Sequence, residues 1–155
     1  VLYVYNVSEG EYKNRTVEGN LSQNELIICA KLEEELADVS EAERLAYLKE
    51  LGIPETGLER LIKAAYRLLG LISFLTAGKK EVRAWTIKAG TKAPQAAGVI
   101  HTDFEKGFIR AQVIEYQKLL EAGSHGSAKQ KGWIRTEGKD YIIKDGDVIE
   151  FLIGS

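Results

Sequence analysis

The chain has 155 residues, 45% of them hydrophobic, and a formal net charge of −2. It is long enough for one ordinary domain or two small ones with a normal globular core. No stretch approaches the roughly eighteen consecutive apolar residues that a membrane-spanning helix needs, and the first residues lack the length and the basic flank of a signal peptide. We therefore expect a cytoplasmic protein that makes no membrane contact.

Acidic and basic residues are distributed unevenly along the chain. Residues 1–70 carry 13 acidic and 8 basic groups, whereas residues 71–155 carry 10 and 13. This asymmetry indicates two units. The chain has no methionine and opens directly in strand-like sequence, so we expect it to be a fragment of a longer protein.

The first 30 residues predict two buried strands. Val1–Val7 is β-branched and aromatic with hardly a polar residue, which is typical of a strand buried on both faces of a parallel sheet. Residues 8–24 have little periodicity and predict a loop, with a poor helix inside it as the alternative, and Glu25–Ala30 then predicts a second buried strand. In α/β sheets of this kind the ligand lies beyond the carboxyl ends of the strands.

Two helices are predicted next. Ser40 and Glu43 have the spacing of a capping box, and the helix that they begin should end at Gly52 and Pro54. After Thr56, apolar residues recur at intervals of three and four, which predicts an amphipathic helix that runs to Gly70.

From Leu71 the pattern changes to short strands. The expected order is a hairpin, a short helix that starts at a proline, a strand, two short helical pieces and a closing hairpin around a tight turn. This order is typical of a small α+β sheet packed on one helix, with the shape of a β-grasp. The corresponding segments are Ile72–Thr76, Glu81–Ile87, the helix from Pro94, Phe108–Ile114, Tyr116–Glu121, Ser127–Lys131, Tyr141–Ile143 and Val148–Ile153.

Several segments together resemble the YchF family of Obg-like ATPases. The resemblance is strongest in TAGKKEVRAWTI at residues 76–87 and GTKAPQAAGVIHTDFEKGFIRA at 90–111. The closing GKDY at 138–141 and DGDVI at 145–149 look like the end of that family's TGS domain. NVSE at 6–9 resembles the family's base-specificity motif, and CAKLE at 29–33 resembles its second base-side loop.

The resemblance implies a two-part fold. Residues 1–70 would be the carboxy-terminal part of an α/β P-loop NTPase domain of the G type. Residues 71–155 would be a TGS domain with the α+β β-grasp fold.

The resemblance also implies a purine site. Asn6 would present its side-chain amide to the base, while the backbone of Val7 and of Ala30 would contact it. Glu9 stands where GTP-specific relatives carry an aspartate that selects guanine, and its different length and position imply ATP, often alongside GTP. Without the resemblance, an ordinary loop would be the better interpretation of NVSE at residues 6–9.

The parts that would hold the phosphates are missing from these 155 residues. There is no GxxxxGK[ST] loop and no switch segment to hold phosphates and Mg²⁺. The parent would be an ATP-hydrolysing, ribosome-associated regulator, whereas this chain alone is predicted to be inactive and to bind no ATP measurably.

Basic residues surround an aromatic side chain on the first predicted hairpin of residues 71–155. Such groups can bind RNA phosphates and stack on bases, although a solvated surface is the competing interpretation. The resemblance implies ribosomal RNA, and no DNA, as the partner. The candidate residues are Lys79, Lys80, Arg83, Trp85, Lys88 and Lys92.

Histidines and the cysteine predict no catalytic or metal site. Cys29 is the single cysteine and should be a small core residue. His101 and His125 lack the further ligands that zinc requires, and His101 is expected at a helix end, bonded to a carbonyl or to Asp103.

Two further aspartates flank Gly146. We interpret Asp145 and Asp147 as turn residues and not as a carboxylate pair, because Asp-Gly suits a tight hairpin. The alternative function for the whole chain is a stand-alone interaction module, in which the TGS domain binds RNA or protein without nucleotide.

Overall fold

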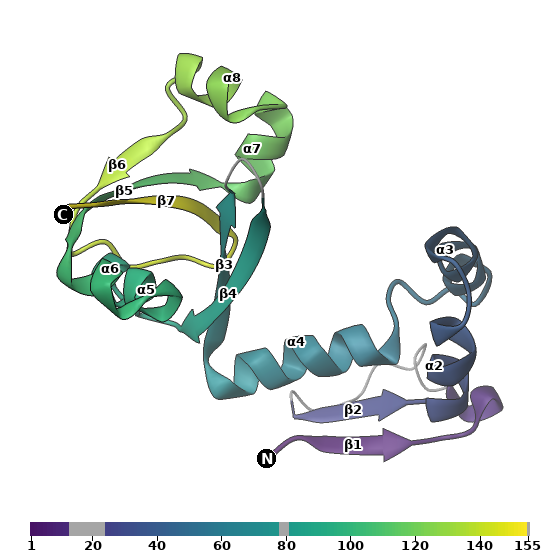
Figure 1. Cartoon of the computed structure of the whole chain (residues 1–155). Helices are drawn as coiled ribbons and strands as arrows, with labels where there is room; N and C mark the ends of the chain where they lie inside the picture. Colours follow the sequence, from purple (N-terminus) through teal and green to yellow (C-terminus); the bar gives the residue numbers. More distant parts are fainter. Residues whose placement is uncertain (13–23, 78–80, 155) are drawn as a thin grey trace. The chain divides into compact units, whose positions relative to one another are not determined.

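The computed structural model describes residues 1–12, 24–77 and 81–154, and it divides the chain into two compact units, Val1–Leu69 and Gly70–Ser155. Each unit has secondary structure and a core of its own (Figure 1). Within the described residues, none of the helices combines the length and the apolar character needed to cross a membrane.

The first unit contains a parallel pair of strands, β1 (Tyr3–Asn6) and β2 (Glu25–Ile28). β2 is the buried member, since Leu26 and Ile27 are only 5% and 3% exposed. The expectation that the first strand is buried on both faces is wrong, because Tyr3 is 56% exposed and Tyr5 is 45% exposed. The physical reason is coverage: β1 pairs with β2, whereas β2 also packs against α4 (Gly57–Leu69) and its Ile27 joins the core.

Helices α2 (Ala30–Ala37) and α3 (Glu41–Glu50) complete the core of the first unit. The predicted capping box at α3 is confirmed, with the Ser40 side chain and the Glu43 carboxylate each bonded to the other's backbone N–H. This core buries Tyr12, Ile27, Cys29, Leu32, Leu36, Leu48 and Ile53, which confirms Cys29 as a core residue.

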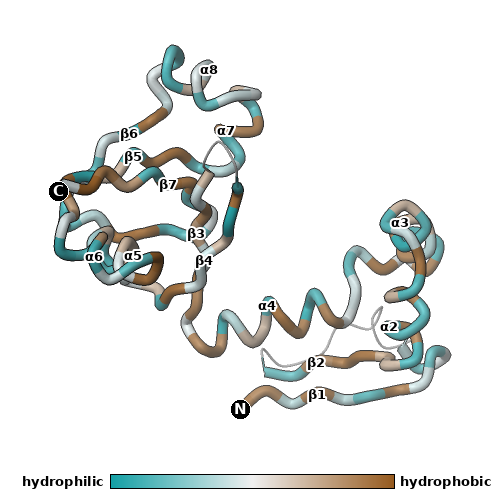
Figure 2. The backbone as a smooth tube through the Cα atoms, in the orientation of Figure 1, coloured by the Kyte–Doolittle hydropathy of each residue, from teal (hydrophilic) through white to brown (hydrophobic). Residues whose placement is uncertain are grey.

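The predicted amphipathic helix is confirmed as α4 (Gly57–Leu69). Hydrophobic and hydrophilic residues alternate along it at helical spacing (Figure 2). Thr56 and Glu59 form a reciprocal capping box at its start, with distances of 2.9 and 3.1 Å between backbone nitrogen and side-chain oxygen. The same Ser/Thr-x-x-Glu spacing is visible in the sequence at Thr56 and Glu59.

The second unit is built on a mixed five-stranded sheet in the order β4-β3-β7-β5-β6. β3 and β7 run parallel at its centre, while β3–β4, β5–β7 and β5–β6 are antiparallel. The strands are β3 (Leu71–Ala77), β4 (Val82–Lys88), β5 (Phe108–Glu115), β6 (Arg135–Glu137) and β7 (Asp147–Ile153). The predicted first hairpin is therefore confirmed within about one residue at each end.

Helices cover both faces of this sheet. Successive residues of a strand point to opposite faces, and Phe74, Val113 and Ile149 join one core while Leu75, Ile114 and Val148 join another. The first core is closed by α5 (Ala93–Ile100) with α6 (Thr102–Lys106), and the second by α7 (Tyr116–Ala122) with α8 (His125–Gln130). The expectation of a sheet packed on one helix is thus incomplete.

The predicted closing hairpin is wrong. Residues 141–143 do not pair with the last strand; Ile142 makes an isolated bridge to Lys92 instead. β7 lies between β3 and β5, so its partners come from distant parts of the chain. The tight turn before it is present, with Gly146 at a φ of 77°.

Candidate nucleotide-base site and basic hairpin

The carboxyl ends of β1 and β2 lie side by side. Asn6 is in register with Ile28, and the Val7 N–H donates to the Ile28 carbonyl at 2.9 Å. The residues that follow both strands therefore reach the same edge of the sheet, which is where an α/β sheet places a ligand. Of the four predicted base-site residues, Asn6, Val7 and Ala30 are brought together in this way.

The Asn6 side chain connects the two strand ends. Its Oδ1 accepts a hydrogen bond from the Ala30 N–H at 3.0 Å. Ala30 is the first residue of α2, and Cys29 before it gives no side-chain cap, so Asn6 satisfies one of the N–H groups that a helix start leaves unpaired. Its Nδ2 donates to no residue that the structure describes. One half of the amide is thus fixed, and the other half can meet a ligand.

Glu9 lies just beyond, in a helical turn that starts after Ser8. The Tyr12 N–H donates to the Ser8 carbonyl at 2.9 Å, and Ser8 and Glu11 form a further reciprocal capping box. This turn begins three residues after the end of β1, and Glu9, its first residue, is partly buried. Residues 9–12 therefore form the poor helix that the sequence left as an alternative to a loop; of the remaining residues 8–24, the structure describes Ser8 and Asn24.

The segment interpreted as a second base-side loop is mostly helix. Only Cys29 is extended, and residues 30–33 form the first turn of α2. The Ala30 N–H is already bonded to Asn6. A contact between the Ala30 backbone and a base stays a prediction, and it would use other atoms or displace Asn6.

Glu33 is a residue whose role the sequence did not reveal. Its carboxylate accepts from the N–H groups of Gly57 at 2.7 Å and Leu58 at 3.1 Å, so α2 caps the start of α4. A carboxylate is favoured there by the helix dipole. A Cβ at Gly57 would lie 2.8 Å from Glu33 Oε1 and 3.1 Å from a methyl of Ile28, so glycine allows this close approach.

Two of the hollows formed by the described residues lie away from these strand ends. One, of about 280 Å³, lies between α2 and α3 and is lined by Glu35, Leu36, Val39, Glu43 and Tyr47. The other, of about 250 Å³, belongs to the second unit and is lined by Thr76, Ala77, Ile100, Phe104, Ile149, Glu150 and Phe151. Neither includes the four predicted base-site residues, and in the described part of the chain no three His, Cys, Asp or Glu side chains cluster as metal ligands would.

The basic hairpin residues are only partly brought together. Arg83 and Trp85 share a face of β4 with the buried Ile87, whereas alternation places Lys88 on the opposite face. Lys92 precedes α5 and forms an ion pair with Asp140 at 2.7 Å. Lys79 and Lys80 lie outside the described residues.

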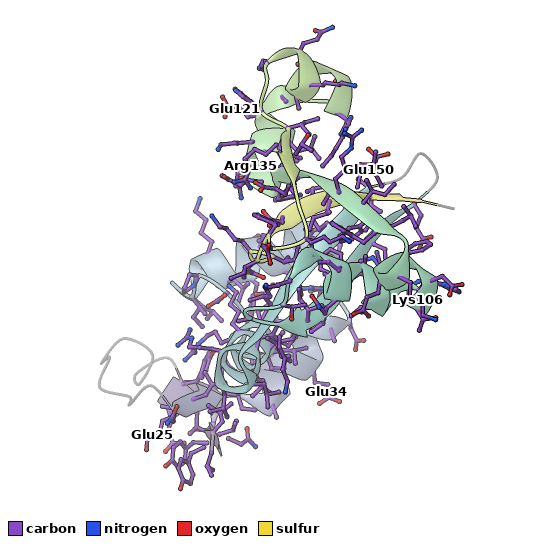
Figure 3. The ribbon with its side chains drawn as sticks, turned by 90° about the vertical axis from the view of Figure 1, so that its left-hand side faces the viewer. Glu25, Glu34, Lys106, Glu121, Arg135 and Glu150 are labelled. Atoms are coloured by element: carbon purple, nitrogen blue, oxygen red, sulfur yellow. The ribbon has the colours of Figure 1, made fainter. Side chains whose placement is uncertain are left out.

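The two aspartates of the last turn do more than favour the turn. Asp145 Oδ1 accepts from the Ser73 N–H of β3 at 2.8 Å. Asp147 is 1% exposed, and its Oδ2 accepts from the Tyr141 hydroxyl at 2.7 Å and from the Lys144 N–H at 2.9 Å. Arg135 of β6 (Figure 3) lies 4.0 Å from Asp147 Oδ1. Both carboxylates hold the sheet together, in agreement with a structural interpretation.

His101 also has the predicted kind of role. Its Nδ1 accepts from the Asp103 N–H at 3.2 Å, and it caps the start of α6 while ending α5.

Comparison with known proteins places the chain in a family. The model of the family YchF-GTPase_C, described as a protein of unknown function (DUF933), matches residues 71–154. The chain is 48% identical over 161 residues to "Ribosome-binding ATPase YchF" of Bacillus subtilis, covering 97% of this chain and 44% of that protein. It is 43% identical over 162 residues to "Obg-like ATPase 1" of Gallus gallus, covering 97% and 41%.

A solved structure agrees. The Schizosaccharomyces pombe YchF GTPase superimposes with a TM-score of 0.82 at 34% identity, over 98% of this chain and 43% of that one. The chain belongs to the YchF/Obg-like ATPase family. It spans less than half the length of these relatives.

Proposed function

We propose that this chain is the carboxy-terminal part of a cytoplasmic, ribosome-associated NTPase that hydrolyses ATP and also accepts GTP. The first unit supplies purine recognition, and the second is a TGS domain of the β-grasp type that contacts ribosomal RNA. Two longer relatives that match 97% of this chain are named ribosome-binding ATPases, which supports the proposal for the longer protein.

One observation carries the purine site. Asn6 Oδ1 is tied to the Ala30 N–H at 3.0 Å, across the carboxyl ends of two parallel strands. This bond fixes the amide plane and leaves Nδ2 for an acceptor nitrogen on a purine. Glu9, in the next turn, adds a carboxylate that can accept a hydrogen from the base. Phosphates and Mg²⁺ would be held by residues outside these 155.

The second unit supports the TGS assignment through its topology. The strands that come first and last along the chain of this unit, β3 and β7, run parallel at the centre of the sheet. α5 packs across one face of the sheet through its small residues Ala93, Ala96 and Ala97. This arrangement has the features of a β-grasp.

Sedimentation of the longer protein with ribosomes tests the proposal. We expect it to pellet with ribosomes to an extent that differs between added ATP and no nucleotide. Pelleting that is the same in both conditions would favour the stand-alone interaction module.

Calorimetry on the present chain should give no measurable ATP binding, because base contacts without phosphate contacts give little affinity. Micromolar binding would refute the proposal that this chain contacts the base while residues outside it hold the phosphates.

A further inference from the structure

Arg83, Trp85 and Thr76 form a connected row across β3 and β4. The Trp85 indole N–H donates to Thr76 Oγ1 at 2.9 Å, and the Arg83 guanidinium carbon lies 4.3 Å from the centroid of the Trp85 ring. Arg83 and Thr76 are also direct cross-strand partners. The row is therefore held by one hydrogen bond, one cation–π contact and the strand register.

Trp85 is poorly placed to receive an RNA base itself. It packs against the core that contains Phe74 and Ile87, and Arg83 lies over its ring. A base could stack on the indole only by displacing the guanidinium. The indole N–H is also occupied, since it is bonded to Thr76.

Arg83, by contrast, is open to a ligand. It is exposed and forms no ion pair with any residue that the structure describes. Lys92 of the same predicted set is paired with Asp140, and Lys88 points to the other face of the sheet. Arginine has a planar, weakly hydrated head group, so one face of it can rest on an aromatic ring while the other meets a base.

We propose that the exposed face of the Arg83 guanidinium is a stacking platform for an unpaired base of single-stranded RNA, and that Trp85 and Thr76 are positioning residues that hold it. This inference rests on the proposed RNA-binding function of the second unit. It replaces the aromatic contact expected from the sequence by an arginine contact supported on the aromatic ring.

Fluorescence anisotropy of the full chain with a labelled single-stranded oligouridine tests it. Arg83→Lys keeps the charge and loses the planar head group, so we expect affinity to fall about tenfold, within the range for one stacked base. The slope of log affinity against log salt should stay unchanged, because no charge is lost. Thr76→Val, which removes the indole's acceptor, should give a smaller loss of about threefold.

The control is Arg110→Lys, the same substitution at an exposed arginine of β5, which should leave affinity unchanged. Equal affinities of the wild type and Arg83→Lys would overturn the inference and leave RNA binding intact. Failure of the wild-type chain to bind RNA would overturn the inference together with RNA binding by the second unit.

Indole fluorescence gives a second readout. In a Trp133→Phe background Trp85 is the remaining tryptophan, since the chain has two. With Arg83 between base and indole, RNA should quench the emission only weakly. Strong quenching would show that the base stacks on Trp85 directly and would contradict the proposal.

Discussion

At the scale of single residues, Asn6 has a structural task as well as its proposed task in base recognition. Removing its side chain in Asn6→Ala should destabilise the first unit by about 1 kcal/mol, because the Ala30 N–H loses its acceptor. Asn6→Asp keeps an acceptor oxygen and should recover most of that stability. Urea unfolding of the present chain gives the free energy of unfolding of both variants. An equal free energy of unfolding for Asn6→Ala and the wild type would show that the hydrogen bond between Asn6 and Ala30 does not stabilise the first unit.

Tyr141 provides a pH-dependent contribution in the second unit. Burial, and then the hydrogen bond to Asp147, raise the pKa of Tyr141 from 10.0 to about 12. A raised tyrosine pKa means that the folded state holds its proton longer than the unfolded state. Its contribution to stability is therefore complete below pH 10 and is lost as the pH rises from 10 towards 12.

Tyr141→Phe should cost about 1–3 kcal/mol at neutral pH, since buried Asp147 loses a donor. The difference in the free energy of unfolding between wild type and variant, measured with guanidinium, should become smaller above pH 10. A difference that stays constant from pH 10 towards pH 12 would show that Tyr141 does not cause the pH dependence of stability.

Some residue roles could be predicted from the sequence and others could not. The Ser40–Glu43 capping box is a local pattern and was predictable; Ser8–Glu11 and Thr56–Glu59 share its spacing and could have been found by the same rule. The orientation of Trp85 depends on which strand face meets α5, and the two capping bonds of Glu33 span about two dozen residues of chain. Such contacts have no local signature.

At the scale of elements, α2 and α4 are linked through Glu33. Glu33→Ala would leave the N–H groups of Gly57 and Leu58 without their acceptor, and we expect a loss of about 1–2 kcal/mol in the first unit. Glu34→Ala is the matched control, because Glu34 is the exposed neighbour on the same helix (Figure 3). Equal unfolding midpoints for the two variants would contradict the role of Glu33.

Elements with strong local periodicity were predicted well. The amphipathic pattern of α4 and the alternation in β3 and β4 are local properties of the sequence. The errors concern partners. β1 is exposed because α4 packs against β2, and β7 joins strands far away in sequence instead of residues 141–143. β6 has three residues and was missed, because so short a strand has too few positions to show a pattern.

At the scale of the whole molecule, the second unit contains two hydrophobic cores built from its own residues alone. We therefore expect residues 70–155, expressed by themselves, to fold. A single cooperative thermal transition with dispersed amide resonances would confirm this expectation. A chain that unfolds without cooperativity would show that the second unit depends on the first.

The two units would have different tasks in the proposed NTPase. In that proposal the strand ends of the first unit place the Asn6 amide for a purine, and the second unit offers Arg83, on the edge strand β4, for RNA. The alignment covers less than half of each relative.

The most direct test compares ATP affinity in the longer protein for wild type, Asn6→Asp and Asn6→Ala by calorimetry. If Nδ2 donates to the purine while Oδ1 holds Ala30, Asn6→Asp should stay folded yet bind ATP about tenfold or more weakly. Asn6→Ala should lose both affinity and stability. An Asn6→Asp variant that binds ATP as tightly as the wild type would contradict the account.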